Sequence, residues 1–501
     1  LGITDAGASV SLYRGASIIR HSPDLLRRPS GVFAFFRSGE KVLPFINAAD
    51  YGFHAEFGAE FEEKRVMHTA RSGAVGVRMI SSVHLRLPCE QRRFSVKNNS
   101  SKDTLAGHLY LYFEPSLAIH AEEEDHPAFS KLFLTDRFDR ANRLLLFTRR
   151  PRNGKNPLCL AAGIAEDVEF SLDTSRERLL DCGDGIPSLL RNKEELKPGR
   201  GSPDACAAFC VRLKIPPKGR SDITLLLCAA STESEAVARF IKAREEGIVP
   251  ADKGAPCPFD PGGIDGVIAD RILPLIFYYT RRSGDSIEAA ARNTLGRQSI
   301  WSFGLSADNP IMLIEVHNPE DVARAVPYIR LNKKLRYSGI ATDVVIAFKE
   351  GGDYDTPIMT AVRAALKKEG CEQSLGVNGG VHAIDLTMRN EEERVALRAA
   401  AVFIAPVSAE RFSLPVKEYK PVSFLAPQPL RVDMEEAYRV KGGVFTPGRF
   451  TVEKKAGNPC VPWCFVLSNQ SFGTLASDKS LGFTWAINSR ENKLTPWYND
   501  L

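Results

Sequence analysis

Short runs in which apolar and polar residues alternate dominate the first half of the chain. Runs of this kind, bounded by polar turn residues, are typical of half-buried antiparallel strands. We expect strands over 77–80, 83–87, 92–96, 108–113, 143–148 and 223–228. One stretch, 233–246, has helical spacing instead. Many short strands with few helices favour a large β-sandwich, which we place over residues 1–248.

The pattern changes after a segment at 250–265 that is rich in Pro, Gly and Asp, which predicts a domain boundary. Beyond it strands and helices alternate, and Asn318 and Pro319 form a typical helix start. Such alternation predicts a parallel sheet with right-handed crossovers, and therefore a small α/β domain with leading helices over 266–406. We expect strands over 311–316, 342–348, 381–386 and 401–404, and helices over 272–280, 319–335, 356–368 and 391–400.

The last hundred or so residues show a third pattern. Residues 407–457 are Pro-rich and irregular, which predicts a linker, and a strand-and-turn pattern resumes over 458–501. A faint repeat relates 5–11 to 478–484, where an acidic turn precedes an alternating strand. The predicted fold class is multidomain β plus α/β: an antiparallel super-β-sandwich, a small parallel α/β domain, and the first strands of a second, related sandwich.

Composition excludes several classes of function. The 501 residues carry a formal net charge of +5 and no long Lys/Arg block, so we expect no nucleic-acid partner. No apolar run is long enough to cross a bilayer, so we expect no membrane contact by this segment itself. The ten cysteines show neither C-x-x-C nor zinc spacing. We therefore expect reduced thiols, no metal site and no cofactor.

Both ends of the chain look internal to a longer protein. It opens at Leu1 without an initiator Met, in residues that already read as strand and turn, and it stops at Leu501 within a motif. We expect a piece of a larger polypeptide.

The densest polar and aromatic stretch lies at 458–500. Trp faces pack against the C–H surfaces of sugars, while Asn, Asp and Arg side chains bond to hydroxyls, so this composition suits a carbohydrate site. The alternative is a sandwich core with paired polar groups. The candidate substrate-binding residues here are Trp485, Arg490, Trp497, Asn499 and Asp500.

This stretch resembles the opening of the sandwich domain of glycoside hydrolase family 94. The motif G-F-T-W-x-x-N-S-R-E-N-x-L-T-P-W-x-N-D runs from Gly482 to Asp500. Residues 295–311 resemble the family's segment between sandwiches, with mild departures at Leu305, Ala307 and Asn309, and 126–133 with 148–152 resemble a first sandwich. The widest resemblance, over nearly the whole chain, is to the cyclic β-1,2-glucan synthases.

The resemblance implies a galactose mutarotase-like super-sandwich in an accessory, carbohydrate-binding and scaffolding region. Its partners would be a β-glucan oligosaccharide and the flanking catalytic domains of the same polypeptide. The family's general-acid Asp lies in a helical barrel, and no residue here corresponds to it, so we assign no catalytic residue. The resemblance also implies a parent anchored in the bacterial inner membrane, with this segment on the cytoplasmic side.

Two other functions stay open at this point. The chain could be the N-terminal part of a β-1,2-oligoglucan phosphorylase, or a non-enzymatic carbohydrate-binding scaffold. Transmembrane segments upstream in the gene would favour the synthase.

Three further features carry less specific signals. The acidic run 122–125 predicts a solvated loop, because consecutive carboxylates cannot flank a sugar ring. The α/β segment lacks G-x-G-x-x-G and G-x-x-x-x-G-K-[ST], so its glycine pairs indicate turns and no nucleotide site. Arg297, Gln298 and Trp301 form a polar cluster with Asp308, which either touches glucan or, as we favour, fastens the α/β domain to the sandwich.

Overall fold

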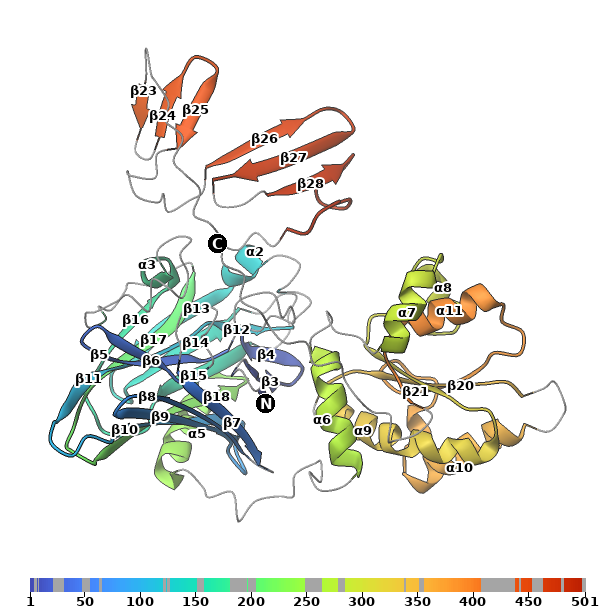
Figure 1. Cartoon of the computed structure of the whole chain (residues 1–501), viewed down its shortest axis with the longest axis horizontal. Coiled ribbons are helices and arrows are strands. Elements are labelled where there is room, and N and C mark those ends of the chain that lie inside the picture. Colours follow the sequence, from blue (N-terminus) through green and yellow to red (C-terminus); the bar gives the residue numbers. More distant parts are fainter. Residues whose placement is uncertain are drawn as a thin grey trace.

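The protein is described by a computed structural model that shows separate β-rich and α/β bodies (Figure 1). The residues that the structure describes are 1–3, 7, 9–20, 31–46, 55–62, 65–119, 123, 127–150, 157–180, 196, 204–247, 264–277, 284–337, 339–350, 356–406, 438–440, 443–452, 463–478 and 482–497.

Two large antiparallel sheets form the N-terminal body. The first has eight strands in the order β13 (Leu134–Asp139), β14 (Leu144–Arg149), β15 (Leu158–Ile164), β18 (Arg220–Ala230), β10 (Cys89–Asn98), β9 (Val75–Val83), β8 (Arg65–Ser72) and β7 (Glu56–Glu62). The second has five, in the order β16 (Phe170–Ser175), β17 (Ala205–Ile215), β11 (Leu105–Phe113), β5 (Phe33–Ser38) and β6 (Lys41–Pro44).

The core lies between these two sheets. Alternate residues of each strand point inward, as the period-2 pattern requires. Phe94 and Leu225 from the first sheet join Phe35 and Phe209 from the second in one buried cluster. Smaller elements close its edges: β1 (Gly2–Ile3), β2 (Ser9–Val10), β3 (Leu12–Tyr13), β4 (Ala16–Ile19), β12 (Pro115–Ala118), α2 (Pro127–Lys131) and α3 (Arg176–Leu180).

The helix α5 (Glu233–Glu246) packs on the outer face of the eight-stranded sheet. Thr232 caps it by accepting from the backbone N–H of Glu235. Its Phe240 packs against outward residues of the sheet, among them Cys228. Burial raises the pKa of the Cys228 thiol, whose Sγ lies 2.8 Å from Cys89 Sγ, so both act as small apolar side chains.

The α/β body is built on a four-stranded parallel sheet. Its order is β21 (Val381–Asp385), β20 (Asp343–Phe348), β19 (Ile311–Glu315) and β22 (Ala401–Ile404). The helices are α6 (Ile264–Phe277), α7 (Gly284–Arg292), α8 (Gln298–Trp301), η3 (Pro319–Ala325), α9 (Val326–Tyr337), α10 (Pro357–Lys368), η4 (Glu372–Ser374) and α11 (Glu391–Ala400).

The two faces of this sheet are covered by different helices (Figure 1). Residues of one parity, such as Met312 and Ile314, pack with α6, α9 and α10. Residues of the other parity, such as Leu313 and Ala347, pack with α8 and α11. The predicted combination of an antiparallel sandwich followed by a parallel α/β domain is confirmed.

Two three-stranded antiparallel sheets follow: β23 (Tyr438–Val440), β24 (Gly443–Thr446) and β25 (Arg449–Val452), then β26 (Cys464–Ser468), β27 (Phe472–Ser477) and β28 (Phe483–Ala486). The first of them lies inside the stretch expected to be linker, 407–457. The Pro447-Gly448 turn, with Gly448 at φ +70°, joins strands too short to stand out beside so many Pro and Gly residues. Residues 407–437 lie outside the described part.

The faint sequence repeat has a counterpart in the backbone. Gly2 pairs with Val10 in β1–β2, and Leu475 pairs with Phe483 in β27–β28, at the same offset of 473 residues. Arg14 and Ile487, one further pair at this offset, both have left-handed backbone, with φ of 52° and 62°. The two ends of the chain therefore share strand register and turn position.

Three local expectations differ from the structure. The helix expected over 272–280 is α6, which already begins at Ile264, while residues 278–280 lie outside the described part. The strand expected over 83–87 is a turn after Val83, because His84 Nδ1 accepts from the N–H groups of Arg86 and Leu87, both at 3.2 Å. The helix expected over 319–335 begins as the 3₁₀ helix η3, although Asn318 caps it as predicted by accepting from Asp321 N–H.

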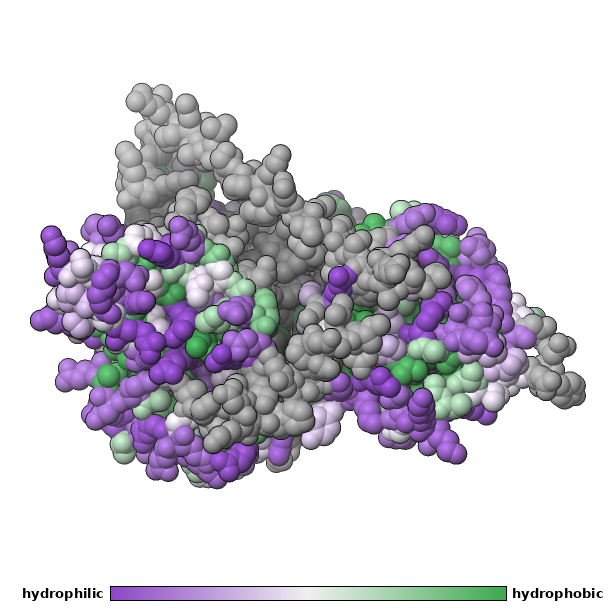
Figure 2. Space-filling view, turned by 60° about the horizontal axis from the view of Figure 1, so that its bottom comes forward, coloured by the Kyte–Doolittle hydropathy of each residue, from purple (hydrophilic) through white to green (hydrophobic). Residues whose placement is uncertain are grey.

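Among the described residues, no helix is long and apolar enough to cross a membrane. On the described surface in the view of Figure 2, hydrophilic residues predominate and the hydrophobic ones are scattered.

Candidate functional site

Three aromatic rings pack on the C-terminal sheet. Phe483 lies 5.2 Å from Trp485 and 5.3 Å from Trp497, between ring centroids. We call Phe483, Trp485 and Trp497 the aromatic platform. Gly473 on the neighbouring strand makes room for it, because a Cβ there would lie 2.2 Å from the Trp485 ring. The platform is half-buried, so its rings keep surface available to a ligand.

The polar residues of the same motif mostly hold the turn after β28. Asn488 Oδ1 accepts from the N–H groups of Arg490 and Glu491, at 2.8 and 3.0 Å. The Asn492 side chain donates to Ala486 O at 3.1 Å. These bonds are an Asx-type turn, which asparagine favours. Much of the motif therefore fixes backbone geometry, and its aromatic side chains are the part not used in these turn hydrogen bonds.

The predicted residues at this end divide into three groups. Trp485 and Trp497 come together through Phe483. Arg490 is exposed on the turn and pairs with Glu491 at 3.0 Å. Asn499 and Asp500 lie outside the described residues. None of their contacts with sugar is established, and all five stay predictions.

The second predicted cluster sits in the α/β body, at α8. Arg297 pairs with Asp308, and Trp301 Nε1 donates to Ser306 O at 3.3 Å, while the Trp301 side chain stays 57% exposed. Gln298 is exposed.

The hydrogen bonds around α8 tie it to neighbouring parts of its own domain. Arg389, just before α11, donates to the carbonyl oxygen of Ser302 at 2.6 Å and lies over the Phe303 ring. The favoured role, fastening to the sandwich, and the alternative role, contact with glucan, both stay predictions for Arg297, Gln298 and Trp301.

A buried charge network in the sandwich was not predicted from the sequence. Glu114, between β11 and β12, accepts from Arg176 Nε at 2.8 Å, Arg20 Nη1 at 2.8 Å and Tyr112 Oη at 2.7 Å. Burial alone would raise the pKa of Glu114, but the guanidinium groups of Arg176 and Arg20 outweigh it and hold that pKa well below its usual range. The only signal in the sequence is an acid directly after an apolar strand.

The network corrects one expectation. Glu123, from the acidic run 122–125, is 6% exposed and accepts from Arg20 Nε at 3.1 Å and from Ser116 Oγ. It is paired inside the protein, so the solvated-loop interpretation is wrong for this residue; 122, 124 and 125 lie outside the described part. Because each carboxylate here faces a cation, the network fastens loops to the sandwich and leaves no free acid or base.

Within the described residues, no group of three or more His, Cys, Asp or Glu side chains is arranged to hold a metal ion.

Comparison with known proteins agrees with this architecture. The sequence profile described as "Glycosyl hydrolase 94, supersandwich domain" matches residues 1–246 and 450–501, more than half of the chain. Cyclic beta-(1,2)-glucan synthase NdvB of Rhizobium meliloti (strain 1021) is 23% identical over 556 residues, covering 99% of this chain and 19% of the relative. The chain thus spans about a fifth of that relative's length.

Solved structures give weaker likenesses. A putative kojibiose phosphorylase from the human microbiome is 10% identical, with 44% of this chain and 25% of that chain covered and a TM-score of 0.26. A polysaccharide lyase is 12% identical, with 48% and 33% covered and a TM-score of 0.28. At these scores the likeness carries no argument. The profile match does, and it shows that this chain is a member of a carbohydrate-active enzyme family, glycosyl hydrolase family 94.

Proposed function

We propose that this chain is a carbohydrate-binding and scaffolding region of a cyclic β-1,2-glucan synthase-like enzyme, whose catalytic barrels lie outside it. The observation that carries the proposal is the relation to the synthase, which runs through 99% of the chain. The substrate would be β-1,2-glucan, and the chain would bind no nucleic acid. It would lie on the cytoplasmic side of a parent anchored in the inner membrane.

The aromatic platform is the proposed glucan contact. Its half-buried rings offer flat apolar surface for the C–H faces of glucose units. Arg490 lies exposed on the adjoining turn, where its guanidinium can donate to sugar hydroxyls. The Asn499 amide would donate to or accept from such hydroxyls, and the Asp500 carboxylate would accept from them. Trp301, with Arg297 and Gln298, is a separate proposed contact on the α/β body.

The proposed domain division follows the same logic. A first super-sandwich takes residues 1–248, an α/β domain 266–406, and the opening strands of a second sandwich 458–501. The match of one family profile to both 1–246 and 450–501 supports this, and so does the shared register at an offset of 473 residues. The two sandwiches would scaffold the flanking catalytic domains.

Calorimetry with β-1,2-linked gluco-oligosaccharides tests the proposal. Trp497→Ala removes one ring of the platform, and we expect it to weaken binding roughly tenfold, which corresponds to about 1.4 kcal/mol. Trp463→Phe is the matched control: it changes a half-buried ring that packs on Phe450 and is no member of the platform, and the variant should bind as the parent does.

Two results would contradict the proposal. One is an absence of heat with every β-1,2-linked oligosaccharide tried. The other is release of glucose 1-phosphate from such an oligosaccharide and inorganic phosphate by this chain alone, because turnover would place a complete active site inside it.

A further inference from the structure

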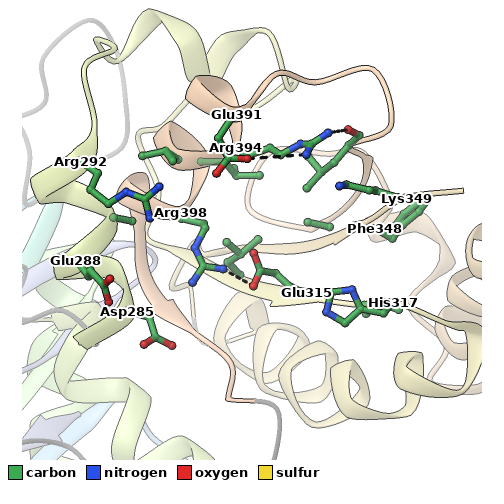
Figure 3. Close-up of a pocket in the computed structure, with 17 residues that line it drawn as sticks. Asp285, Glu288, Arg292, Glu315, His317, Phe348, Lys349, Glu391, Arg394 and Arg398 are labelled. Atoms are coloured by element: carbon green, nitrogen blue, oxygen red, sulfur yellow. Dashed lines mark hydrogen bonds and ion pairs between the residues drawn. The ribbon is translucent and has the colours of Figure 1, made fainter. Parts of the chain in front are cut away.

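The α/β domain contains a cavity of about 620 Å³ at the carboxyl ends of β19 and β20, on the face covered by α7 and α11 (Figure 3). This volume is within the range of small-molecule sites. Open parallel sheets bind their ligands beyond the carboxyl ends of the strands. The floor is apolar, with Leu313, Ala347 and Leu397.

Two helices line the walls, and each contributes three charged side chains at the same spacing. α7 contributes Asp285, Glu288 and Arg292, and α11 contributes Glu391, Arg394 and Arg398. Both sets have the spacing i, i+3, i+7, which places them on one face of each helix. Figure 3 shows both rows beside the cavity.

The strand ends add Glu315, His317 and Lys349. Among the lining residues four carboxylates therefore oppose four permanent cations, and the formal charge of the lining is zero. An ion of either sign gains little from such a lining.

Part of this charge is already paired. Arg398 bonds to Glu315 in the middle of the cavity. Burial alone would lower the pKa of Arg398, but the hydrogen bond to Glu315 and the nearby carboxylates of Asp285 and Glu288 outweigh it and raise that pKa.

Four other side chains, Asp285, Glu288, Arg292 and Lys349, make no ion pair or side-chain hydrogen bond with another residue in the described part of the chain. Two are acceptors and two are donors.

A phosphate ligand is disfavoured by how the neighbouring helices begin. Helix N-termini bind phosphate through free backbone N–H groups. At the start of η3, Asn318 Oδ1 accepts a hydrogen bond from the backbone N–H of Asp321 at 3.0 Å. The Asp321 carboxylate accepts one from the backbone N–H of His317 at 3.1 Å.

At α10 and α11, the two other helices that follow strands at this edge of the sheet, a carboxylate also accepts from a backbone N–H at the helix start. At α10 Glu350 accepts from Met359 N at 2.8 Å, and at α11 Glu393 accepts from Asn390 N at 3.1 Å. Each start thus carries a carboxylate of the chain itself, which would repel an incoming phosphate.

We propose that this cavity binds a neutral polyhydroxylated ligand, namely glucose units of a saccharide. Each sugar hydroxyl donates one hydrogen bond and accepts others, so it satisfies carboxylates and guanidinium groups together. The apolar floor and Phe348 face the less polar side of a sugar ring. The site rests on the proposed function and extends the proposed glucan handling to a third place, since it needs no residue of the aromatic platform and none of Arg297, Gln298 and Trp301.

Hydrogen–deuterium exchange of the full chain with the β-1,2-linked disaccharide of glucose tests the inference. We expect slower exchange in α7 and in the first turns of α11. The same protection should appear in Trp497→Ala, which separates this site from the platform.

A double variant measures affinity. Glu288→Gln with Arg292→Gln should lower disaccharide binding, measured by calorimetry in the Trp497→Ala background, by about tenfold. Arg363→Gln with Glu372→Gln, an exposed pair on the α10 side of the sheet, is the matched control and should leave it unchanged. Exchange without sugar verifies that both variants are folded.

Three outcomes would overturn the inference: protection by inorganic phosphate or a nucleoside diphosphate in place of the disaccharide, no protection of α7 by the disaccharide in a folded chain, or equal affinities of the two double variants. Each leaves the proposed function standing if binding at the platform persists. Loss of platform binding with protection of α7 intact would instead count against the platform and support the cavity as the saccharide site.

Discussion

The two ends of the chain place the same hairpin in two different surroundings. At the N-terminus, Val10, Ile18 and Ile19 are at most 7% exposed, packed within the sandwich. At the C-terminus, the counterpart of Val10 is Phe483, which is half-buried, and the β26 residues Phe465, Val466 and Leu467 are 53–67% exposed. Strand register and the left-handed turn residue are common to both.

The difference lies in the side chains that the shared backbone carries. Leu12 occupies the position that Trp485 has at the other end, and Val10 the position of Phe483. A backbone frame set by local turn chemistry can therefore hold either buried core residues or half-exposed aromatic rings. The strand register is the same at both ends, whereas the side chains that it carries differ.

We expect the largest difference in stability between the two ends from substitutions at one pair of equivalent cations. Arg20 and Lys493 occupy equivalent positions, but Arg20 bonds to Glu114 and Glu123 inside the sandwich, whereas Lys493 lies 5.8 Å from the Phe483 ring centre on a half-exposed surface. We expect Arg20→Met to destabilise the sandwich by about 3–5 kcal/mol, because buried carboxylates lose a partner. Lys493→Met should cost less than about 1 kcal/mol.

Amide exchange of β4 and β11 measures the first change, and exchange of β28 measures the second. Equal costs at the two positions would contradict the idea that the same frame is buried at one end and exposed at the other.

We expect a smaller difference in the stability cost of Gly→Ala substitutions at one glycine from each end. Gly482 has φ +68°, and a Cβ there would lie 1.7 Å from Leu475 O, whereas Gly15 has φ +81° and open space around it. Gly482→Ala should cost about 3 kcal/mol from strain plus overlap, and Gly15→Ala about 1 kcal/mol from strain alone. Near-ultraviolet circular dichroism of Trp485 and Trp497 reports the first, and a normal spectrum for Gly482→Ala would refute it.

The smallest effect concerns the two left-handed residues. Arg14→Gly and Ile487→Gly each relieve a positive φ, offset by the greater entropy of glycine in the unfolded chain. We expect both to stabilise their hairpins by less than about 1 kcal/mol, and Ile487→Gly the more, because a β-branched residue is the more strained. Amide exchange of each hairpin gives the sign, and destabilisation at both positions would argue against a common turn.

Local chemistry explains which parts of the fold could be predicted. The helix expected over 391–400 has those bounds in the structure, because Asn390 and Glu393 form a capping box that is visible in the sequence. The turn at His84 could not be seen, since an imidazole acceptor replaced the usual turn residues. The sheet over 438–452 was hidden because its strands have only three or four residues.

The candidate sites also differ in whether their residues lie close together in the sequence. Trp485 and Trp497 could be proposed as site residues because aromatic residues are conspicuous in a short motif, and that role stays a prediction. The Glu114 network and the α/β cavity were missed because their partners, such as Arg20 with Glu114 or Arg398 with Glu315, are far apart in sequence and meet only through strand order. The hydrophobic pattern of a sequence predicts single helices and strands. The order of the strands in the sheets decides which distant polar side chains become neighbours.

Carboxylates accept from backbone N–H groups at three helix starts of the α/β domain. This bears on how the proposed site would discriminate between neutral and phosphorylated molecules in the cell. A parallel sheet of this kind would ordinarily be exposed to competition from phosphorylated metabolites. In the proposed saccharide site, the carboxylates of Asp321, Glu350 and Glu393 would repel such anions from the helix starts. The proposed neutral ligand would then bind at this edge of the sheet even where phosphorylated solutes outnumber it.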